Sequence, residues 1–588
     1  MMNKDMPNCR RGDYQSPAEK PKNRPNEIIT GARVLIETLI SEGVDTVFGY
    51  PGGAVLHIYD ELYKNAGRIN HVLSAHEQGA AHAADGYARV SGKTGVVIAT
   101  SGPGATNLVT GIANAYLDSV PMVAVTGNVT ESMLGKDSFQ EVDIVGITQP
   151  VVKHSYIVRD AAKLERTLRE AFLIANTGRK GPVLVDVPKS VQQAECGYSG
   201  RPAALRTCQI KYDNDFDGAI NAINNCARPY IYCGGGVLAS DAGDVIMALS
   251  EKISAPIGLS MMGMTAVPHS CELNLGMCGM HGRYAATVAQ SEADLVIAAG
   301  VRFSDRATGD PDKYSQSCKI IHIDIDAAEI GKNVRSQIGL RGDVREVLDQ
   351  ILPRIEAVPR GVWLSRVKEI KKEGKKAFNR EPTGEFTPAG IIKTVRRHCG
   401  DGTVIATDVG QHQMWVMQHY PFEKPRTLLT SGGLGAMGYG LGAAVGGCLA
   451  SGKRRTVLFT SDGSFGMNLT ELATAVSQEL PVSIVILNNG ALGMVRQWQS
   501  LFFGGRHSQT TLRRETDFPA LARAFGAGGF AASSLGELES ILDNNLSPDR
   551  PTVIDCRIDI DEKVYPMVPP GGSAGDIIIG SSEQKWEQ

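Results

Sequence analysis

The sequence has little that would tie it to a membrane, to nucleic acid or to an oxidising compartment. No apolar run approaches the ~18 residues needed to span a bilayer. The net charge of −3 gives no reason to expect a nucleic-acid partner or an anionic membrane. None of the 11 cysteines forms a Cys-x-x-Cys pair, which is typical of reduced core residues in a cytoplasmic protein. Residues 1–26 lack the apolar core of a secretory signal, so we expect a disordered polar tail there.

What remains is an ordinary globular composition with enough length for several domains. The 588 residues are 42% hydrophobic and 21% charged. Short β-branched runs alternate with amphipathic helices, and four of them are Thr46–Tyr50, Gly95–Thr100, Met122–Gly127 and Gly181–Val187. Near-continuous apolar strands separated by helices are typical of a parallel sheet covered on both faces. The pattern therefore predicts an α/β protein built from doubly wound parallel-sheet domains.

We expect the boundaries of these domains in polar, charged or Pro-containing stretches. Two such stretches are Cys196–Asp215, which reads as a linker, and Lys368–Glu385, which reads as a charged helix and linker. The predicted divisions are a tail at 1–26, three domains at 27–195, 215–355 and 385–565, and an irregular C-terminal lid or tail at 566–588.

A magnesium and phosphate site is expected in the third domain. Asp462 stands at the carboxyl end of the predicted strand Thr456–Thr460, where α/β sheets place ligands, and Gly463 would let a phosphate approach the backbone. A predicted helix, Leu469–Gln478, and a strand, Val482–Leu487, then lead to Asn489. A carboxylate, an amide oxygen and a backbone carbonyl suit Mg²⁺ shared with a diphosphate. The alternative is a helix-capping Asp and an unrelated Asn turn.

A second candidate carboxylate, Glu77, lies far upstream at the start of a helix rich in small residues. A buried helical Glu is usually part of an ion pair. The alternative is a cofactor ring nitrogen that shares the carboxyl proton, and burial would raise the pKa of Glu77 to suit that exchange. The neighbouring His76 reads as a structural residue rather than a metal ligand. Glu77 and the Asp462 site together point to thiamine diphosphate.

Several long motifs identify the chain more closely. They are Phe48–Ala54, His76–Ala81, Ala99–Asn107, Phe139–Asp143, Ser431–Gly438 and Gly493–Gln499. With these motifs, the chain from Ile28 to Pro570 resembles the catalytic large subunits of acetohydroxyacid synthase (acetolactate synthase), a thiamine-diphosphate enzyme family. The resemblance implies a pyrimidine-binding domain, a central FAD-binding domain and a diphosphate-binding domain, in that order.

The resemblance also implies roles for individual residues. Glu77 would activate the cofactor, Met437 would hold it bent, and Asp462, Asn489 and the carbonyl of Ala491 would bind the metal. The other residues implied at thiamine diphosphate are Pro103, Asn107, Val409, Gly410, Gln411, His412, Gly463 and Ser464. Gly53, Gln140 and Lys153 would line the substrate channel with Phe139, and Trp498 would shape the pocket for the second substrate. Trp498 read alone could equally be an interface aromatic.

The middle domain would bind FAD, which plays no net redox role in this family. Gly234, Gly235 and Gly236 follow a predicted strand, but the six-residue glycine fingerprint of dinucleotide sites is absent. Arg302 and Arg306 would pair with a pyrophosphate, and Asp324 would accept from a ribose hydroxyl. The remaining residues implied at the flavin are Arg179, Met280, His281, Gly300 and Asp343.

The chain departs from the family pattern at a few positions. Ser461 stands where the turn before the metal ligand usually has Gly, and its hydroxyl could bond a phosphate. Lys136 and Ser138 replace Thr and Ala ahead of Phe139, and Ser304 replaces an Asp near the flavin. These departures bear on flavin affinity more than on catalysis, since none touches Glu77, Asp462 or Asn489.

The implied reaction is decarboxylation of pyruvate and ligation of the two-carbon unit to a second pyruvate or to 2-oxobutyrate. It gives 2-acetolactate or 2-aceto-2-hydroxybutyrate, the entry to valine, leucine and isoleucine. The family builds its site across a subunit interface, which implies a homodimer or tetramer and allows a small regulatory subunit. Two alternatives stay open: a pyruvate oxidase, which would share both cofactors, and a catalytically silent paralogue that serves as a binding subunit.

Overall fold

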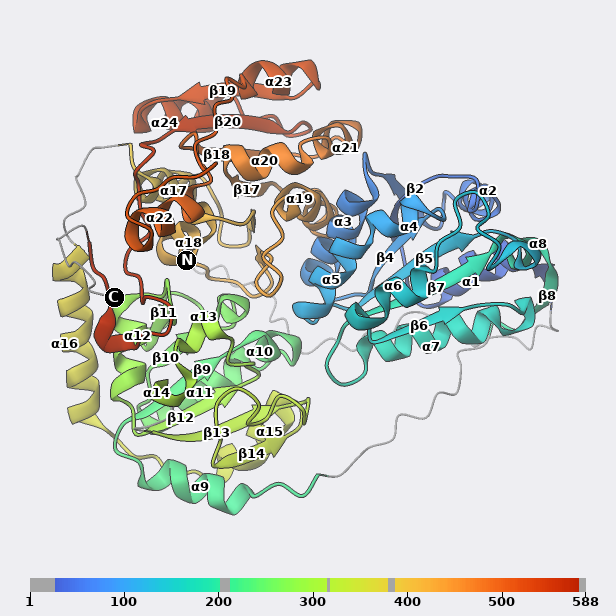
Figure 1. Ribbon diagram of the computed structural model, residues 1–588. Coiled ribbons are helices and arrows are strands. Elements are labelled where there is room, and N and C mark those ends of the chain that lie inside the picture. Colours follow the sequence, from blue (N-terminus) through green and yellow to red (C-terminus); the bar gives the residue numbers. More distant parts are fainter. Residues whose placement is uncertain (1–26, 201–211, 315–317, 379–385, 581–588) are drawn as a thin grey trace, which may run out of the picture.

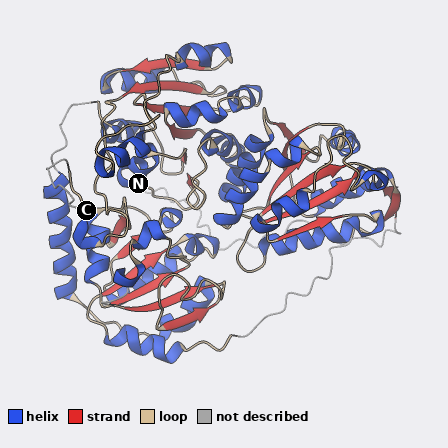
Figure 2. Cartoon of the chain, in the orientation of Figure 1, coloured by secondary structure: helices blue, strands red, loops and turns tan. Residues whose placement is uncertain are grey.

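The computed structural model describes residues 27–200, 212–314, 318–378 and 386–580. Its chain forms three six-stranded sheets, each of parallel strands with helices packed around it (Figures 1 and 2). The prediction of an α/β protein with three parallel-sheet domains is confirmed. The predicted tail at 1–26 lies outside the described residues.

The N-terminal domain contains a sheet with the strand order β3-β2-β4-β5-β7-β6. Its strands are β2 (Thr46–Tyr50), β3 (Asn70–Leu73), β4 (Gly95–Ala99), β5 (Met122–Asn128), β6 (His154–Ile157) and β7 (Pro182–Pro188). Its helices are α1 (Gly31–Ser41), α2 (Leu56–Lys64), α3 (Glu77–Ser91), α4 (Pro103–Asn107), α5 (Val109–Leu117), α6 (Ile144–Thr148), α7 (Leu164–Asn176) and α8 (Lys189–Gln193).

The middle domain contains a sheet with the order β11-β10-β9-β12-β13-β14. Its strands are β9 (Pro229–Cys233), β10 (Ile257–Leu259), β11 (Asn274–Met277), β12 (Leu295–Ala299), β13 (Lys319–Asp324) and β14 (Ile338–Arg341). Its helices are α9 (Phe216–Asn225), α10 (Gly235–Ala239), α11 (Gly243–Ile253), α12 (Tyr284–Glu292), α13 (Asp305–Thr308), α14 (Pro311–Tyr314), α15 (Val344–Ile351) and α16 (Gly361–Phe378).

The C-terminal domain contains a sheet with the order β16-β15-β17-β18-β20-β19. Its strands are β15 (Val404–Thr407), β16 (Leu428–Leu429), β17 (Thr456–Thr460), β18 (Val482–Asn488), β19 (Gly528–Ala532) and β20 (Thr552–Arg557). Its helices are α17 (Pro388–Arg397), α18 (Gln411–His419), α19 (Tyr439–Ala450), α20 (Asp462–Asn468), α21 (Glu471–Ser477), α22 (Gly493–Phe502), α23 (Phe518–Ala524) and α24 (Leu535–Asn544).

The N-terminal and C-terminal domains meet where α3 packs closely against α19 (Figure 1). Glycines make this approach possible. A Cβ atom on Gly446 would lie 1.8 Å from the carbonyl oxygen of Ala83, and one on Gly86 would lie 2.2 Å from that of Ala443. The backbones of the two helices therefore touch, and the helix that begins at Glu77 is fixed against the C-terminal domain.

Two local predictions were wrong. The predicted linker from Cys196 is still strand at its start, because β8 (Glu195–Tyr198) pairs with β1 (Glu27–Thr30) in a separate antiparallel ribbon. The segment after β17 holds two short helices instead of a turn and one helix, since α20 already begins at Asp462. Short-range patterns did not reveal either feature, because one depends on a pairing far along the chain and the other on a cap.

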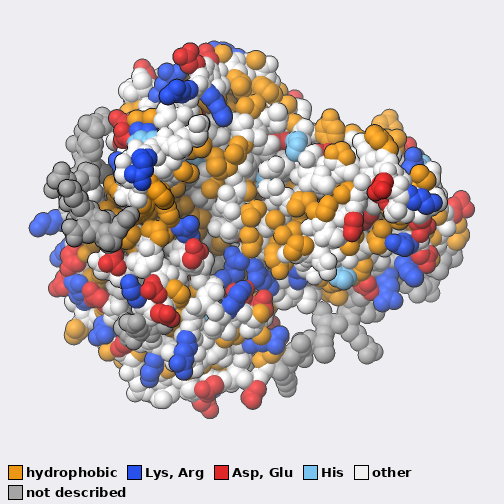
Figure 3. All heavy atoms as spheres, viewed as in Figure 1, with side chains coloured by type: hydrophobic (Ala, Val, Ile, Leu, Met, Phe, Trp, Pro, Cys, Tyr) orange, Lys and Arg blue, Asp and Glu red, His pale blue; other side chains and the backbone are white. Residues whose placement is uncertain are grey.

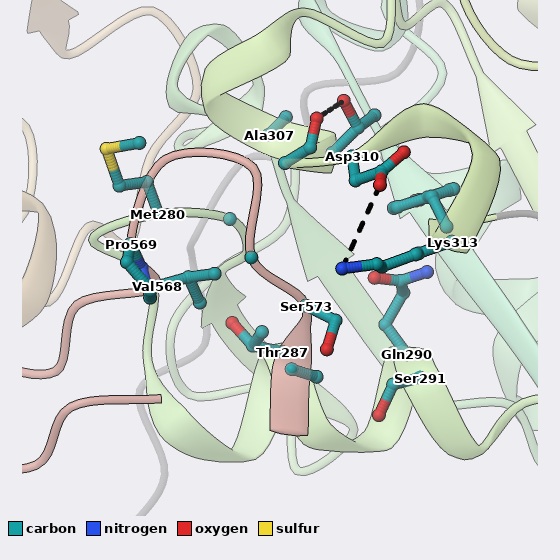
Figure 4. A pocket seen from close by; sticks show the side chains of 16 residues that line it. Met280, Thr287, Gln290, Ser291, Ala307, Asp310, Lys313, Val568, Pro569 and Ser573 are labelled. Atoms are coloured by element: carbon teal, nitrogen blue, oxygen red, sulfur yellow. Dashed lines mark hydrogen bonds and ion pairs between the residues drawn. The ribbon is translucent and has the colours of Figure 1, made fainter. Parts of the chain in front are cut away.

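The C-terminal segment, whose residues 566–580 are described, lies against the middle domain. The backbone N–H of Val568 donates to Met280 O at 2.8 Å, and Asp310 N donates to Gly572 O at 3.4 Å. Figure 4 shows Val568, Pro569 and Ser573 along one side of a pocket that the middle domain completes. The segment thus reaches Met280, one of the predicted flavin residues, and its role as a lid stays a prediction.

Candidate active site

The carboxyl ends of β15, β17 and β18 bring together the residues predicted for a metal and a diphosphate. These three strands are neighbours in the sheet and run parallel, so the segments that follow them meet at one edge. Val409 to His412 follow β15, Asp462 to Ser464 follow β17, and Asn489 and Ala491 follow β18.

Asp462 is the first residue of α20 and has an unsatisfied oxygen. Its side chain is 8% exposed, and its Oδ1 atom is buried without a hydrogen-bond partner. Burial raises the pKa of this carboxyl group to about 6. A buried carboxylate oxygen without a donor is costly unless a cation or another donor meets it, so the residue fits a Mg²⁺ ligand.

Ser461 does not need the freedom of the glycine it replaces. Its φ of −124° is ordinary extended backbone, and its hydroxyl accepts from Ser464 N at 3.3 Å as the cap of α20. The Ser464 hydroxyl in turn donates to Val409 O at 2.9 Å, which joins the segments after β17 and β15.

Asn489 lies beside Gln411, and a glycine makes room for both. Asn489 Nδ2 donates to Gln411 Oε1 at 3.1 Å, while Asn489 Oδ1 accepts from Ala491 N at 3.2 Å. A Cβ on Gly493 would lie 2.0 Å from Gln411 Oε1. Among the described residues no group of three or more His, Cys, Asp and Glu side chains could hold a metal. A cation here would therefore use one carboxylate with amide and backbone oxygens.

His412 and Met437 complete the cluster. His412 is 1% exposed, its Nε2 atom has no hydrogen-bond partner, and burial lowers its pKa to about 3. The neutral imidazole lies beside Gly410, where a Cβ would come within 3.0 Å of His412 Cε1, so glycine leaves space for the ring. A Cβ on Gly463 would lie 4.0 Å from Met437 Cε, so Met437 reaches the start of α20.

Glu77 is held in the N-terminal domain by a second group of predicted residues. It is the first residue of α3 and 9% exposed, and its Oε2 accepts from Asn107 Nδ2 at 3.0 Å. Asn107 ends the short helix α4, which begins at Pro103. His76 caps α3, since its Nδ1 atom accepts from Gln78 N at 3.1 Å. The prediction that His76 is structural agrees with this cap.

Gly53 and Gln140 lie in loops near this group, whereas Lys153 does not join it. The loop of Gly53 is tied to the end of β4, because Ala54 N donates to Thr100 Oγ1 at 3.2 Å. A Cβ on Gly102 would lie 2.9 Å from Gln140 Cα. Lys153 donates to backbone carbonyls instead, with Nζ 2.7 Å from Thr177 O, and burial lowers its pKa to about 8.

The carboxyl edge of the middle sheet carries the predicted flavin residues. Gly234 and Gly236 lie against Gly300. A Cβ on Gly234 would lie 2.0 Å from Gly300 O, and one on Gly236 would lie 2.6 Å from Gly300 Cα. A Cβ on Gly235 would lie 3.3 Å from Met262 Cβ. Asp324 ends β13, accepts from Asp326 N at 2.8 Å, and has its pKa raised to about 6 by burial. Such a glycine cradle beside a carboxylate fits a dinucleotide.

Asp343 serves as a cap in this structure. Its carboxylate accepts from Arg345 N at 2.9 Å at the start of α15. It follows β14, the strand next to β13, and so lies along the same edge of the sheet as Asp324.

The predicted arginines occupy different places. Arg179 reaches across to the middle domain and pairs with Glu329 at 3.0 Å, and burial together with the Arg179 charge lowers the pKa of Arg302. Arg306 lies over the ring of Trp498, with Cζ 5.2 Å from the ring centroid. Trp498 therefore contacts the middle domain, as expected of an interface aromatic.

Met280 and His281 lie between the middle and C-terminal domains. Met280 N donates to Arg306 O at 2.8 Å. His281 is half-buried, its buried Nε2 atom has no hydrogen-bond partner, and desolvation of the ring lowers its pKa to about 4. An orphaned ring nitrogen beside Met280 leaves a polar contact for a ligand.

The described hydrogen bonds of Ser304, Lys136 and Ser138, where the chain departs from the family pattern, stay within the local segments that carry them. Ser304 precedes α13 and makes no side-chain cap there. Ser138 N and Lys136 N donate to Glu141 at 3.0 and 3.3 Å, which organises the loop before Phe139.

Sequence reasoning missed Asp408, a buried residue that supports the diphosphate edge. Its Oδ1 accepts from Val409 N at 2.9 Å and from Gly438 N at 2.8 Å, and burial raises its pKa to about 6. It thereby ties the segment after β15 to the loop that carries Met437. An Asp directly after a buried strand was the signal that could have revealed it.

Within one chain, no hydrogen bond in the described part joins the Glu77 group to the Asp462 group. The Glu77 group belongs to the N-terminal domain and the Asp462 group to the C-terminal domain. A single cofactor that used both would have to bridge the space between an N-terminal and a C-terminal domain.

Three family models match the chain, one for each sheet. The thiamine pyrophosphate enzyme N-terminal TPP binding domain matches residues 29–147, the central domain matches 216–351, and the C-terminal TPP binding domain matches 408–556.

Curated relatives match nearly the whole chain. The acetolactate synthase large subunit of Corynebacterium glutamicum is 43% identical over 574 residues, which cover 95% of this chain and 92% of the relative. The acetolactate synthase of Arthrospira platensis is 44% identical, covering 94% and 98%. The acetolactate synthase isozyme 1 large subunit of Escherichia coli is 41% identical, covering 93% and 97%.

Proposed function

The chain belongs to the acetolactate synthase large subunits of the thiamine pyrophosphate enzymes, and from this membership we propose the reaction that it catalyses. It decarboxylates pyruvate and joins the two-carbon unit to a second pyruvate or to 2-oxobutyrate. The products are 2-acetolactate and 2-aceto-2-hydroxybutyrate. The observation that carries the proposal is the unpartnered Asp462 oxygen at an edge of the sheet shared with Asn489 and His412.

Glu77 is the acid–base residue. When bound, thiamine diphosphate supplies the nucleophilic carbon and the electron sink for loss of carbon dioxide. The carboxyl group of Glu77 would share a proton with a ring nitrogen of the bound cofactor, and Asn107 orients this carboxyl group through the 3.0 Å hydrogen bond. Met437 lies on the loop that Asp408 supports and would help to position the bound cofactor.

Asp462, Asn489 and the carbonyl of Ala491 hold Mg²⁺. Val409, Gly410, Gln411, His412, Gly463 and Ser464 border the diphosphate, and Pro103 borders the cofactor from the N-terminal domain. Gly410 and Gly493 leave room at this edge for the side chains of His412, Gln411 and Asn489. His412, which burial keeps neutral, has a buried Nε2 atom without a protein partner that a ligand could satisfy.

The middle domain holds FAD. The cradle of Gly234, Gly235, Gly236 and Gly300 accepts the pyrophosphate, and Asp324 accepts from a ribose hydroxyl. Arg179 and Arg302 supply positive charge, and Met280, His281 and Asp343 complete the site. Arg306 lies further out on Trp498, so we assign it the weakest part in pyrophosphate binding.

Gly53 and Gln140, with Phe139, line the channel to the reacting carbon, and Trp498 favours 2-oxobutyrate as the second substrate. Lys153 donates to Thr177 O away from these loops, so we assign it the weakest part in the channel. Phe139 is 87% exposed in the single chain. This exposed aromatic ring is available for contact with a second chain.

The working enzyme is a homodimer or a tetramer, and a small regulatory subunit is allowed. Large hydrophobic side chains are exposed on both thiamine-related domains, among them Leu56, Phe139, Met467 and Phe503. Figure 3 shows such side chains grouped on the surface of the N-terminal and C-terminal domains. A second copy would cover them and bring the Glu77 group of one chain to the Asp462 group of the other. Pyruvate and 2-oxobutyrate are the small-molecule partners.

The protein acts in the cytoplasm according to this proposal. The cysteines of the described residues are all free, as expected in a reducing compartment. No helix of the described chain is long and apolar enough to cross a membrane.

The test is a reconstitution of activity. The full chain is incubated with pyruvate, with or without thiamine diphosphate, Mg²⁺ and FAD, and acid treatment converts acetolactate to acetoin for detection. We expect acetoin only when thiamine diphosphate and Mg²⁺ are present. A pyruvate oxidase would consume oxygen or a quinone instead, and a silent paralogue would form no product; either result would refute the proposal.

A further inference from the structure

Glu471 crosses from the C-terminal domain to the turn that leads into Glu77. It is the first residue of α21 and is 1% exposed. Its Oε1 accepts from His76 N at 3.0 Å, and its Oε2 accepts from Ala75 N at 3.3 Å. These are the two backbone N–H groups directly before Glu77, so a carboxylate of another domain sets where α3 begins.

Thr474 and Gly79 complete this contact. The Thr474 hydroxyl donates to Glu471 Oε2 at 2.6 Å and accepts from Ala75 N at 3.1 Å. A Cβ on Gly79 would lie 2.1 Å from Glu471 Oε1. The first turn of α3 thus leaves room for the carboxylate and cannot shift without breaking its bonds.

Asp118 makes the reverse contact, from the N-terminal domain to the loop before Met437. It follows α5, and its two oxygens accept from Gly432 N at 3.0 Å and Gly433 N at 2.7 Å. Its side chain is fully buried and pairs with Arg89 of α3 at 2.9 Å. Arg89 also pairs with Asp85 at 2.6 Å, so the charge of the guanidinium is shared between two buried carboxylates.

We propose that Glu471 and Asp118 are positioning residues that hold, each from the other domain, the backbone on either side of the cofactor chemistry. Glu471 places Glu77, and Asp118 places Met437. The inference rests on the proposed roles of Glu77 and Met437. Each carboxylate accepts from two neighbouring backbone N–H groups of the other domain. Small displacements of reacting groups cost large factors in rate.

Hydrogen–deuterium exchange of the full chain with its cofactors tests the two contacts separately. Glu471→Gln turns an acceptor into a donor, so we expect faster exchange in peptides covering 74–78 and unchanged exchange in those covering 431–437. Asp118→Asn should give the opposite pattern. Each variant is therefore the control for the other. Thr474→Val, which removes the hydroxyl at constant shape, should raise exchange at 74–78, and Thr474→Ser should restore it.

The kinetic expectation is a fall in kcat without loss of substrate binding. Glu471→Gln and Asp118→Asn should each lower kcat by about tenfold or more, with KM for pyruvate changed less than about twofold, since positioning acts on the chemical step. Any of three results would overturn the inference. The targeted segment could exchange at the wild-type rate, both segments could exchange faster to the same extent in both variants, or kcat could be unchanged. If the wild-type chain forms no acetolactate, the proposed function fails, while the exchange pattern still reports on the contacts.

Discussion

Asp462 and His412 show how single atoms mark the candidate site. Both side chains are buried, and each keeps one polar atom without a partner in the described structure. Nearly all buried polar groups of native proteins have hydrogen-bond partners, so two unpartnered polar atoms at one edge of the sheet indicate a ligand. The sequence could predict which residues stand there, but burial and pairing are properties of the fold.

Replacing Glu77 by Gln tests the acid–base assignment. The amide keeps the shape and can still accept from Asn107, but it cannot carry the proton that the cofactor shares. We expect kcat to fall by about 10²–10⁴-fold, the usual range for loss of an acid–base group, with an unchanged melting temperature. Glu61→Gln is a matched control, because Glu61 is a buried helical Glu of the same domain, 7% exposed, paired with Lys64. Full activity in Glu77→Gln would refute the assignment.

Asp186 makes the stability of the folded protein depend on pH, and the burial of its carboxyl group sets the direction of that dependence. Burial raises its pKa from 3.8 to about 7, although Thr126 and Asn128 donate to it at 2.7 and 2.6 Å. The folded protein thus holds this proton more tightly than the unfolded chain, and the stabilisation is lost as pH rises from about 4 to about 7.

Thermal unfolding of the wild type and of Asp186→Asn between about pH 4 and pH 7 tests this loss of stability. The wild type should lose stability relative to the variant by up to about 1.4 kcal/mol per pH unit. A difference that stays constant from about pH 5 to pH 7.5 would show that Asp186 does not titrate there.

At the scale of elements, the α3–α19 contact depends on glycine. Gly446→Ala would place a Cβ 1.8 Å from Ala83 O, so the helices must separate, and we expect a loss of about 1–3 kcal/mol or more in stability. Gly536 is the matched control, since it lies in helix α24 and no atom lies within 4 Å of the position that a Cβ would take. Gly536→Ala should be neutral or slightly stabilising. Equal melting temperatures for both variants would contradict the packing argument.

Elements with strong local patterns were predicted well. Thr46–Tyr50 and Thr456–Thr460 have the bounds of β2 and β17, because a β-branched run buried on both faces is a local signal. The strand β8 and the start of α20 were missed. The first requires β1, more than 160 residues away, and the second contains Gly463 and Gly466, which lower helix propensity.

At the scale of the molecule, the fold class followed from the alternation of strands and helices, and family membership from long motifs. The contacts of Glu471 with Ala75 and His76, about 395 residues away, could not be predicted from one sequence, because a buried carboxylate gives no local sign of its partner. The same holds for the arrangement that brings Glu77 and Asp462 to one cofactor.

Complementation between two inactive variants tests that arrangement directly. Glu77→Gln and Asp462→Asn are each expected to be inactive, and the two chains are then co-expressed. If one active site takes Glu77 from one copy and Asp462 from the other, a mixed dimer contains one intact site. Half of the dimers would be mixed, so about a quarter of the wild-type activity should return. Activity that stays at the level of the single variants, although mixed dimers are recovered, would contradict a cofactor shared between two chains.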